Sequence, residues 1–349
     1  MPDQMNPKWK IGRLGIDGRV VLGPMSGYTS PAYRDFMKPF GVALSITEMV
    51  SDKGIIYDQE KTTEYLRFPR NHPTGLQLFG GDPEEMAQAA ARALSINPDI
   101  DMIDLNMGCP VGKITKNGGG SALMRDPVKC AEIVRRVNAA VDVPVTVKIR
   151  LGWSRSEMNY MDVIEETVSA GADAVMLHAR TRTEKYAGNP DYEPLRGLRD
   201  DMSVPLVISG NVYCLDDALT AMETTGADGV MVARGGVGNP FLVTQIDHYL
   251  RTGERLPNPT VGQQVDWCLE FSRMLIDEKG EETAVRKLRS YAPRFISGCR
   301  YGREYRNAIA TESWTFADME RILRSIAEKR GDEVIECRRG LHDRLEDDF

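Results

Sequence analysis

The sequence predicts an α/β protein, a (β/α)8 TIM barrel followed by a C-terminal all-α helical domain. Three observations lead to this prediction: eight short apolar runs within the first 235 residues, helical patterns between them, and a change of texture after residue 250. Continuously apolar strands that alternate with helices indicate a parallel sheet covered on both faces. Eight such units are typical of a closed barrel. A doubly wound open sheet is the alternative, but no GxGxxG turn follows the first strand.

The eight expected strands occupy residues 20–25, 44–49, 75–80, 102–108, 144–150, 174–180, 205–211 and 229–235. Helical patterns fill the intervals between them. Two of these patterns open on an Asp-Pro pair, Asp82-Pro83 and Asp126-Pro127, in which the aspartate is the expected N-cap and the proline stands in the first turn. The similar segments VPVTVKI…GADAVML and VPLVISG…GADGVMV indicate repeated strand–helix–strand units.

The chain divides into four expected parts. Residues 1–250 form the barrel, and residues 251–264, which are polar and contain two prolines, form a linker. Residues 265–335 form a helical domain, because VDWCLEFSRMLIDEKG and FADMERILRSIAEKRG space their apolar residues three or four apart and end at glycine. Residues 336–349 form an acidic, poorly ordered tail.

The composition is that of an ordinary soluble protein, with 42% hydrophobic and 27% charged residues among 349. No apolar run approaches the roughly 20 residues that span a membrane, and the first residues, MPDQMNPKWK, lack the apolar core of a secretory signal. We therefore expect a cytoplasmic protein, with a monomer as the default. Six scattered cysteines, without a CxxC pair or a histidine at ligand spacing, argue against a metal site and against a disulfide framework.

The net charge of −7 gives no global signal for nucleic acid, but the charge is unevenly distributed. The segment 286–306 holds seven basic residues against one acid, interleaved with three tyrosines and a phenylalanine. This pattern fits a solvated helical face, and it also fits a surface that binds an RNA backbone.

A barrel enzyme carries its reactive groups where each strand meets the following loop. The residues expected at these places are Pro24 and Met25, Glu48, Gln77, Asn106 with Cys109, Lys148, His178, Gly210 and Asn211, and Arg234 and Gly235. A lone histidine there is more often structural. The ammonium of Lys148, within a strand, requires an anionic partner.

Two glycine segments, SGNV (209–212) and ARGGVGNP (233–240), follow the last two strands. Backbone N–H groups exposed by glycine, with an arginine nearby, cradle phosphate, although tight turns alone would also explain these glycines. We therefore expect a phosphate-bearing cofactor whose planar ring lies over the barrel mouth, with its polar edge at Gln77, Lys148 and His178. Flavin mononucleotide (FMN) fits, because it has one phosphate and a ring whose reduced, anionic form a lysine stabilises.

Several segments resemble the dihydrouridine synthases, in the order that the family has them. They are GPMSGYTSPAYR (23–34), ITEMVS (46–51), LQLFGGDPEEMAQAA (76–90), DLNMGCPVGKITKNGGGSALM (104–124), VTVKIRLGW (145–153), LHARTRTEKYAGNPDY (177–192) and GADGVMVARGGVGNPFL (226–242). The pattern is closest to the bacterial B-type, nitrogen-regulation-like branch. The resemblance implies an enzyme that holds FMN and uses NADPH to reduce particular uridines of the tRNA D loop to 5,6-dihydrouridine, with a helical domain that binds the tRNA.

The resemblance also implies roles for residues at matching positions. Cys109 would protonate C5 of the uracil when hydride from the flavin reaches C6, and a thiol, with a reference pKa of about 8.5, is mostly protonated near neutral pH. The implied FMN contacts are Pro24, Met25, Gln77, Lys148 and His178, with Gly210, Asn211, Ala233, Arg234 and Gly235 at the phosphate end. Asn106 matches the position beside the uracil. Contacts with the nucleotide or with RNA phosphate are expected of Lys113, Lys116, Arg180, Arg182, Arg286 and Lys287. Gly118 to Gly120 are expected to let the loop move or the RNA backbone approach.

Two other functions stay open on the sequence. A dihydroorotate-dehydrogenase-like FMN barrel would act on a free pyrimidine, but it gives no reason for an added helical domain with a basic, aromatic stretch. A catalytically silent RNA-binding protein gives no reason for Asn106, Cys109 and Lys148 together. Turnover of a free pyrimidine would favour the first, and absence of bound flavin would favour the second.

Overall fold

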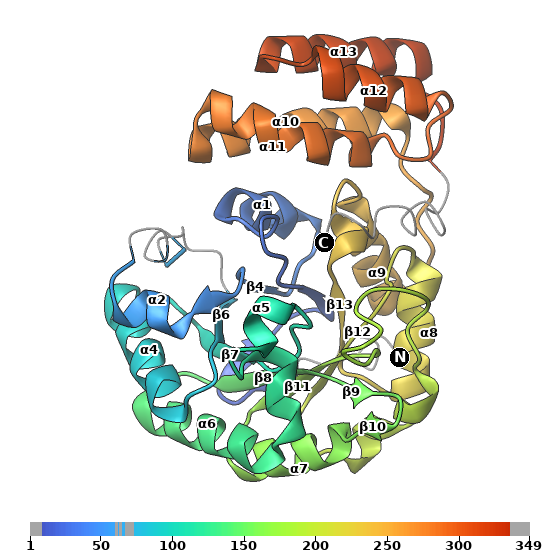
Figure 1. Ribbon diagram of the computed structural model, residues 1–349. Helices are drawn as coiled ribbons and strands as arrows, with labels where there is room; N and C mark the ends of the chain where they lie inside the picture. The colour runs from blue at the N-terminus through green and yellow to red at the C-terminus, as the bar shows by residue number, and fades with distance from the viewer. Residues whose placement is uncertain (1–8, 60–61, 63–64, 67–72, 336–349) are drawn as a thin grey trace.

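The protein is a closed barrel with a layer of helices above it (Figure 1). The computed structural model describes residues 9–59, 62, 65–66 and 73–335. The parallel barrel strands are β3 (Val20–Leu22), β4 (Leu44–Ile46), β6 (Thr74–Phe79), β7 (Met102–Asn106), β8 (Val145–Arg150), β11 (Ala174–His178), β12 (Leu206–Ser209) and β13 (Gly229–Val232). Pairing of β4 with β6 closes the ring and excludes an open sheet.

All eight expected strands are confirmed, but most of them end earlier than expected. The first ends at Leu22, because Pro24 has no N–H to continue the ladder. The fourth ends at Asn106, whose own side-chain oxygen accepts the N–H groups of Gly108 and Cys109. The apolar runs therefore continue past the sheet into the loops of the barrel mouth.

Helices cover the outside of the barrel (Figure 1). They are α1 (Pro31–Met37), α2 (Asp52–Ile56), α4 (Pro83–Ile96), α6 (Pro127–Ala140), α7 (Tyr160–Ser169), α8 (Leu215–Thr225) and α9 (Phe241–Thr252). The single-turn helix α5 (Gly112–Thr115) lies instead at the barrel mouth, in the loop after β7. The two expected N-caps are confirmed, since Asp82 accepts the N–H groups of Glu84 and Glu85 and Asp126 accepts that of Lys129, each at 3.0 Å. Between β11 and β12 the described helical turns are short 3-10 turns, Glu193–Leu195 and Leu198–Asp201.

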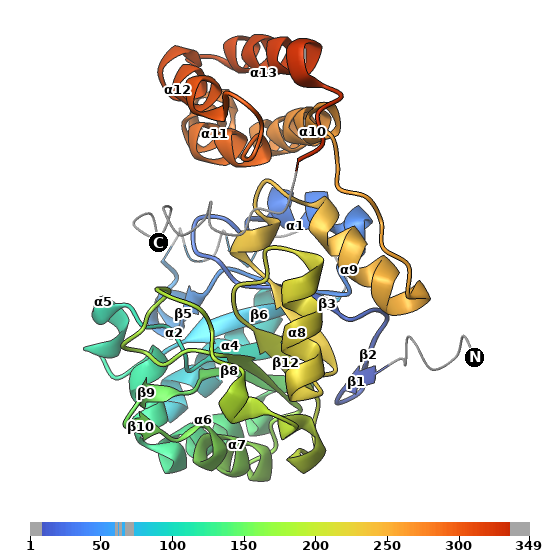
Figure 2. The same cartoon turned by 90° about the vertical axis from the view of Figure 1, so that its right-hand side faces the viewer.

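An N-terminal hairpin closes one end of the barrel. Its strands, β1 (Trp9–Ile11) and β2 (Leu14–Ile16), pair antiparallel. Trp9, Ile11 and Ile16 are buried in one cluster with inward-facing strand residues such as Met176 and Met231. Figure 2 shows this hairpin on the side of the barrel opposite α5, which follows β7. The strand ends that carry the expected site residues are therefore at the other, open end. A second hairpin, β9 (Gly152–Ser154) with β10 (Glu157–Met158), follows β8, and β5 (Val50–Ser51) pairs with β6.

The helical layer above the barrel consists of α10 (Val261–Lys279), α11 (Glu281–Phe295), α12 (Gly302–Glu312) and α13 (Phe316–Arg330). The expected linker 251–264 is too long, because α9 extends to Thr252 and α10 begins at Val261. A capping box starts α10: Gln263 N–H donates to Thr260 Oγ1 at 3.3 Å, and Thr260 N–H donates to Gln263 Oε1 at 2.9 Å. The rest of the domain division stays a prediction, and the expected tail 336–349 lies outside the described residues.

Buried aromatic rings join the helical layer to the barrel. Tyr33 and Phe36 of α1 pack against Phe271 of α10, with ring centroids 5.7 and 5.3 Å apart. Phe271 in turn lies 5.1 Å from Tyr291 of α11. One apolar core therefore runs from the barrel into α10 and α11. Among the described residues, no helix is both long enough and apolar enough to cross a membrane.

Candidate active site

A cavity of about 300 Å³ opens at the barrel mouth and gathers the side chains at the strand ends. Its walls include most of the residues that the sequence singled out: Pro24, Met25, Gln77, Asn106, Cys109, Lys148, His178, Gly210, Ala233, Arg234 and Gly235. Asn211 does not line it. Its Oδ1 accepts a hydrogen bond from Arg234 Nη2 at 3.0 Å, so it lies behind the arginine. All the expected cofactor residues except Asn211 are thus brought together around one cavity.

A chain of hydrogen bonds leads from a buried acid to the backbone of Cys109. Thr146 Oγ1 and Gln77 Nε2 each donate to Asp104 at 2.7 Å. Asn106 Nδ2 donates to Gln77 Oε1 at 2.9 Å, and the Cys109 N–H donates to Asn106 Oδ1 at 2.9 Å. Because both oxygens of Asp104 accept, the orientation of each following amide is fixed in turn. The chain thereby sets the position of the backbone that carries the thiol.

Strand register builds this chain of hydrogen bonds. Gln77 on β6 lies opposite Asp104 on β7, and Asp104 lies opposite Thr146 on β8. Asp104 was not among the predicted site residues. The available signal was an acid inside the apolar run MIDLN, which requires hydrogen-bond donors once it is buried. Burial raises the pKa of Asp104, while the donors Gln77 and Thr146 and the charge of Lys148 act in the opposite direction.

The Cys109 thiol is held in its protonated form. Burial raises its pKa, and this outweighs the hydrogen bond from the Val111 N–H and the charges of Arg150 and Lys148. Lys113 and Lys116 are exposed on and beside α5. A protonated thiol at a cavity wall is able to act as a general acid.

Of the three glycines after Cys109, Gly119 and Gly120 are required by packing, whereas a Cβ on Gly118 would meet no atom within 4 Å, so the expectation of loop movement or RNA approach stays a prediction for Gly118. A Cβ on Gly120, which has a φ of +57°, would lie 2.7 Å from the Cys109 carbonyl oxygen, and one on Gly119 would lie 2.9 Å from that of Gly80. Ser121 also donates to the Cys109 carbonyl through both N–H and Oγ, each at 3.0 Å. The loop therefore closes tightly around the cysteine.

Lys148 supplies a cation to the cavity, and the charge of Asp104 favours its protonated form. Burial, followed by repulsion from Arg150, lowers its pKa to about 8. Within the described part of the chain, its ammonium has neither a hydrogen bond nor an ion pair. Burial and the surrounding cations also keep the pKa of His178 well below its usual value, so the imidazole is neutral. This wall fits an anionic, hydrogen-bonding ring edge, such as that of a reduced flavin.

The loops after β12 and β13 meet at the other side of the cavity. A Cβ on Gly235 would overlap the carbonyl of Val212, and one on Gly210 would overlap the hydroxyl of Tyr192. Gly235 therefore allows a close approach of the two loops, and Gly210 allows one between the loop after β12 and Tyr192 in the segment before β12. Arg234 lies with its guanidinium carbon 5.1 Å from the Tyr186 ring centroid, and its cation faces the same cavity. The arginine and the glycine backbone together fit one phosphate group.

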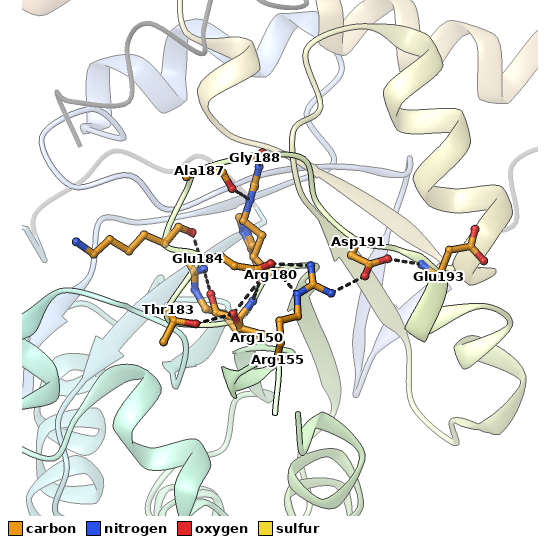
Figure 3. Close-up of polar contacts among 12 residues, drawn as sticks. Arg150, Arg155, Arg180, Thr183, Glu184, Ala187, Gly188, Asp191 and Glu193 are labelled. Atoms are coloured by element: carbon orange, nitrogen blue, oxygen red, sulfur yellow. Dashed lines mark hydrogen bonds and ion pairs between the residues drawn. The ribbon is translucent and has the colours of Figure 1, made fainter. Parts of the chain in front are cut away.

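Hydrogen bonds and ion pairs from arginines hold the loop 181–193 in place (Figure 3). Arg180 donates to the carbonyls of Ala187 and Gly188, and Arg150 donates to those of Thr181 and Lys185. Arg155 binds the carboxylates of Glu184 and Asp191 at 2.6 and 2.5 Å. The expectation that Arg180 faces a nucleotide is therefore wrong. Its side chain is fully buried, because it supplies the donors that the turning backbone needs.

The same loop presents Tyr186, which sequence reasoning missed, to the cavity. Its ring lies 5.3 Å from the Arg150 guanidinium carbon and 6.3 Å from the His178 ring centroid. Lys185, just before it, has a left-handed φ of 50°. Arg182 lies outside the cavity lining, 4.4 Å from the Trp153 ring centroid.

Comparison with known proteins decides the family. The family model described as "Dihydrouridine synthase (Dus)" matches residues 21–326, which include the barrel and most of the helical layer. The chain belongs to the dihydrouridine synthase family.

Relatives with a similar extent support the assignment. The chain is 35% identical to a "Probable tRNA-dihydrouridine synthase" of Rickettsia bellii, over 90% of this chain and 96% of the relative. It is 33% identical to the "tRNA-dihydrouridine synthase B" of Pseudomonas aeruginosa, over 92% and 96%. The presence of such B enzymes agrees with the expected branch. A histamine dehydrogenase from Rhizobium sp. 4-9 shares the fold alone, with a TM-score of 0.55 and 17% identity, over 78% of this chain and 51% of that one.

In this dihydrouridine synthase, the basic segment 286–306 is only partly available to a partner. Arg286 is exposed and lies 3.6 Å from Glu282 one turn earlier. Lys287 is half-buried, with its Nζ 3.5 Å from the Gly27 carbonyl oxygen. Arg294 is buried against Tyr28 and therefore does not contribute to a surface. Arg300 and Arg303 are exposed. Among the described residues, no cluster of three or more His, Cys, Asp or Glu side chains is placed to hold a metal ion.

Proposed function

We propose that the protein reduces particular uridines in the D loop of tRNA to 5,6-dihydrouridine, with FMN as its cofactor and NADPH as the reductant. The observation that carries the proposal is a protonated thiol and a lysine without a hydrogen bond or ion pair to the described residues, both on the walls of one cavity, in a chain of the dihydrouridine synthase family. FMN and NADPH are inferred from the family, and the D loop from the same resemblance.

The walls of the cavity divide naturally between cofactor and substrate. Lys148, His178 and Gln77 would hold the polar edge of the flavin, and Arg234 with the backbone of Gly210 and Gly235 would hold its phosphate. Pro24 and Met25 supply an apolar wall. When bound, FMN supplies the hydride that reduces C6 of the uracil.

The protein itself supplies the second hydrogen. Negative charge that develops toward C5 of the uracil needs a proton, and the Cys109 thiol is protonated at neutral pH. Asn106 lines the cavity, with its amide held by Gln77 and by the Cys109 N–H, which supports a role for it in orienting a uracil beside the thiol. After donation, the thiolate is stabilised by Arg150 and Lys148, whose charges act on Cys109.

The tRNA must be drawn toward this mouth from outside. Lys113 and Lys116 stand exposed beside the Cys109 loop, and Arg286, Arg300 and Arg303 are exposed in the helical layer. Such cations would neutralise phosphates on the RNA backbone. The uridine would leave its stacked loop at a cost of a few kcal/mol.

The test compares classes of substrate under one condition. Purified protein is incubated with FMN and NADPH, together with unmodified tRNA, free uridine or orotate, and NADPH consumption is measured against reduced pyrimidine. The proposal predicts that NADPH consumption matches the formation of reduced pyrimidine when tRNA is the substrate, and that free uridine and orotate are not reduced. Turnover of orotate or free uridine in preference to tRNA would instead identify an oxidoreductase of free pyrimidines.

A further inference from the structure

The segment that follows β3 forms one wall of the cavity and then meets the helical layer. Pro24, Met25 and Ser26 line the cavity. The next residue, Gly27, accepts hydrogen bonds at its carbonyl from the Tyr291 hydroxyl at 3.1 Å and from Lys287 Nζ at 3.5 Å, both on α11. The Tyr291 hydroxyl also lies 3.0 Å from the Tyr28 carbonyl oxygen.

The same peptide is held from the barrel side as well. The Gly27 N–H donates to Glu48 Oε2, in the loop after β4, at 2.6 Å. Gly27 has a φ of +80°, a conformation that glycine adopts without strain. Gly27, which continues the cavity wall, is thus hydrogen-bonded on one side to Glu48 of the barrel and on the other to Tyr291 of α11.

Ring contacts fix Tyr28 against α11. The Tyr28 and Tyr291 ring centroids are 4.9 Å apart, and Arg294 Nη2 donates to the Tyr28 hydroxyl at 3.2 Å. Burial raises the pKa of the Tyr291 phenol far above its usual value, so the hydroxyl keeps its proton and stays a donor. The contact is therefore a partly buried polar one, in which a buried phenol meets backbone carbonyls beside Arg294 and Lys287.

Helix α11 also touches the wall on the phosphate side. A Cβ on Gly238, which has a φ of +72°, would lie 2.6 Å from the backbone nitrogen of Phe295. Gly238 belongs to the loop after β13, in which Ala233, Arg234 and Gly235 line the cavity. The C-terminal half of α11 thus abuts two of the loops that build the cavity.

We propose that α11 is a positioning element for the cofactor cavity, in which the Tyr291 hydroxyl holds the Pro24–Ser26 wall in place. Tyr291 touches none of the reacting groups and acts through the Gly27 peptide. The inference rests on the proposed FMN site. It assigns to the helical layer a second role, in holding the flavin, beside any contact with tRNA.

Tyr291→Phe tests this, because it keeps the buried ring and removes one donor. Tyr160→Phe is a matched control, because the Tyr160 hydroxyl also donates to a backbone carbonyl, that of Pro194, at 2.5 Å. Neither Tyr160 nor Pro194 lines the cavity. FMN-loaded proteins are diluted, and the release of FMN is followed by the recovery of its fluorescence. Thermal unfolding is measured beside it. Loss of one neutral hydrogen bond predicts roughly two- to tenfold faster FMN release in Tyr291→Phe, with no change in Tyr160→Phe.

The outcomes separate the inference from the proposed function. FMN release from Tyr291→Phe at the wild-type rate, or equal acceleration in both variants, would overturn the positioning role while leaving the flavin site intact. A wild-type protein that binds no FMN would overturn the proposed function itself. If Tyr291→Phe does not fold, Lys287→Met removes the other donor to the Gly27 carbonyl, and an unchanged release rate there would count against the inference in the same way.

Discussion

Cys109 stands between two opposing influences. Burial raises the pKa of its thiol, whereas Arg150 and Lys148 favour the thiolate. Burial prevails in the free protein, so the thiol carries the proton that the proposed reaction would deliver to C5 of a uracil. The nearby cations then stabilise the thiolate that remains. The chain of hydrogen bonds from Asp104 through Gln77 and Asn106 holds the backbone that carries this thiol, and so would fix where the proton is delivered in the proposed reaction.

Replacing Cys109 with alanine should separate the oxidation of NADPH from the reduction of the uridine. Cys109→Ala should bind FMN and oxidise NADPH normally, while formation of dihydrouridine falls by roughly 10²- to 10⁴-fold, the usual contribution of a general acid. Single-turnover assays with unmodified tRNA measure both. Cys214→Ala, which removes a half-buried thiol outside this cavity, should have no such effect. Dihydrouridine formation at the normal rate in Cys109→Ala would show that another group donates the proton.

Lys148 should reduce the stability of the flavin-free protein, and the effect should depend on pH. At neutral pH the lysine is protonated in both states, so folding buries a charge, and Lys148→Met should raise the unfolding midpoint by roughly 2–8 °C. Between pH 8 and 10.5, the ordinary pKa of a lysine, the folded state loses this proton while the unfolded state keeps it. The stability of the wild-type protein therefore rises with pH in this range, and the difference in unfolding midpoint between it and Lys148→Met becomes smaller.

The measurement is thermal unfolding of both proteins from pH 7 to 10.5, with FMN binding measured at pH 7. Lys148→Met should bind FMN more weakly although it unfolds at a higher temperature. A variant that is less stable at every pH would contradict the assignment of Lys148 as a cation whose burial costs stability.

At the scale of elements, the loops after β12 and β13 depend on glycine for their contact. A Cβ on Gly235 would overlap the Val212 carbonyl, which belongs to backbone and cannot rotate away. Gly235→Ala should therefore cost roughly 1–3 kcal/mol of stability and weaken FMN binding. Gly15→Ala is the control, since no atom lies within 4 Å of its added Cβ. Denaturant unfolding of both variants measures the difference, and equal stabilities would mean that the two loops separate without cost.

Helix α11 offers a matched pair of arginines for testing RNA contact. Arg286 on α11 and Arg135 on α6 are both exposed and both paired with a glutamate about one turn earlier, Glu282 and Glu132. Arg286→Glu should weaken tRNA binding, and it should lower the slope of log Kd against the logarithm of the salt concentration by about 1. Arg135→Glu should change neither. NADPH oxidation without tRNA should be the same in both, and an unchanged affinity in Arg286→Glu would place the RNA elsewhere.

For the whole molecule, the apolar runs were enough to predict the barrel, because a parallel strand buried on both faces leaves a plain signal. Strand ends were less predictable, since the runs continue through Pro24 and Asn106 into loops that use other hydrogen-bond partners. Cys109, Lys148 and His178 stood out as polar groups after apolar runs. Asp104 and Tyr186 did not, because their places depend on register between strands and on a loop held by distant arginines.

The wrong prediction for Arg180 also arises from contacts that form only in the folded chain. Its sequence neighbourhood, HARTR, suggested a cation facing a nucleotide, but the carbonyls of the loop 181–193 take its donors. Hydrogen-bond satisfaction of a turning backbone is a property of the folded chain, and a sequence pattern does not reveal it. Contacts between α11 and the loop after β3 join residues more than 250 positions apart and were equally hidden.

The most direct measurement of the central claim weighs the product. Protein, FMN, NADPH and an unmodified tRNA transcript are incubated, the RNA is digested, and its nucleosides and fragments are analysed by mass spectrometry. The account predicts a uridine that gains about 2 Da, the mass of one hydride and one proton added across C5 and C6, in a fragment from the D loop. Flavin bound and NADPH present, with no uridine gaining mass, would contradict it.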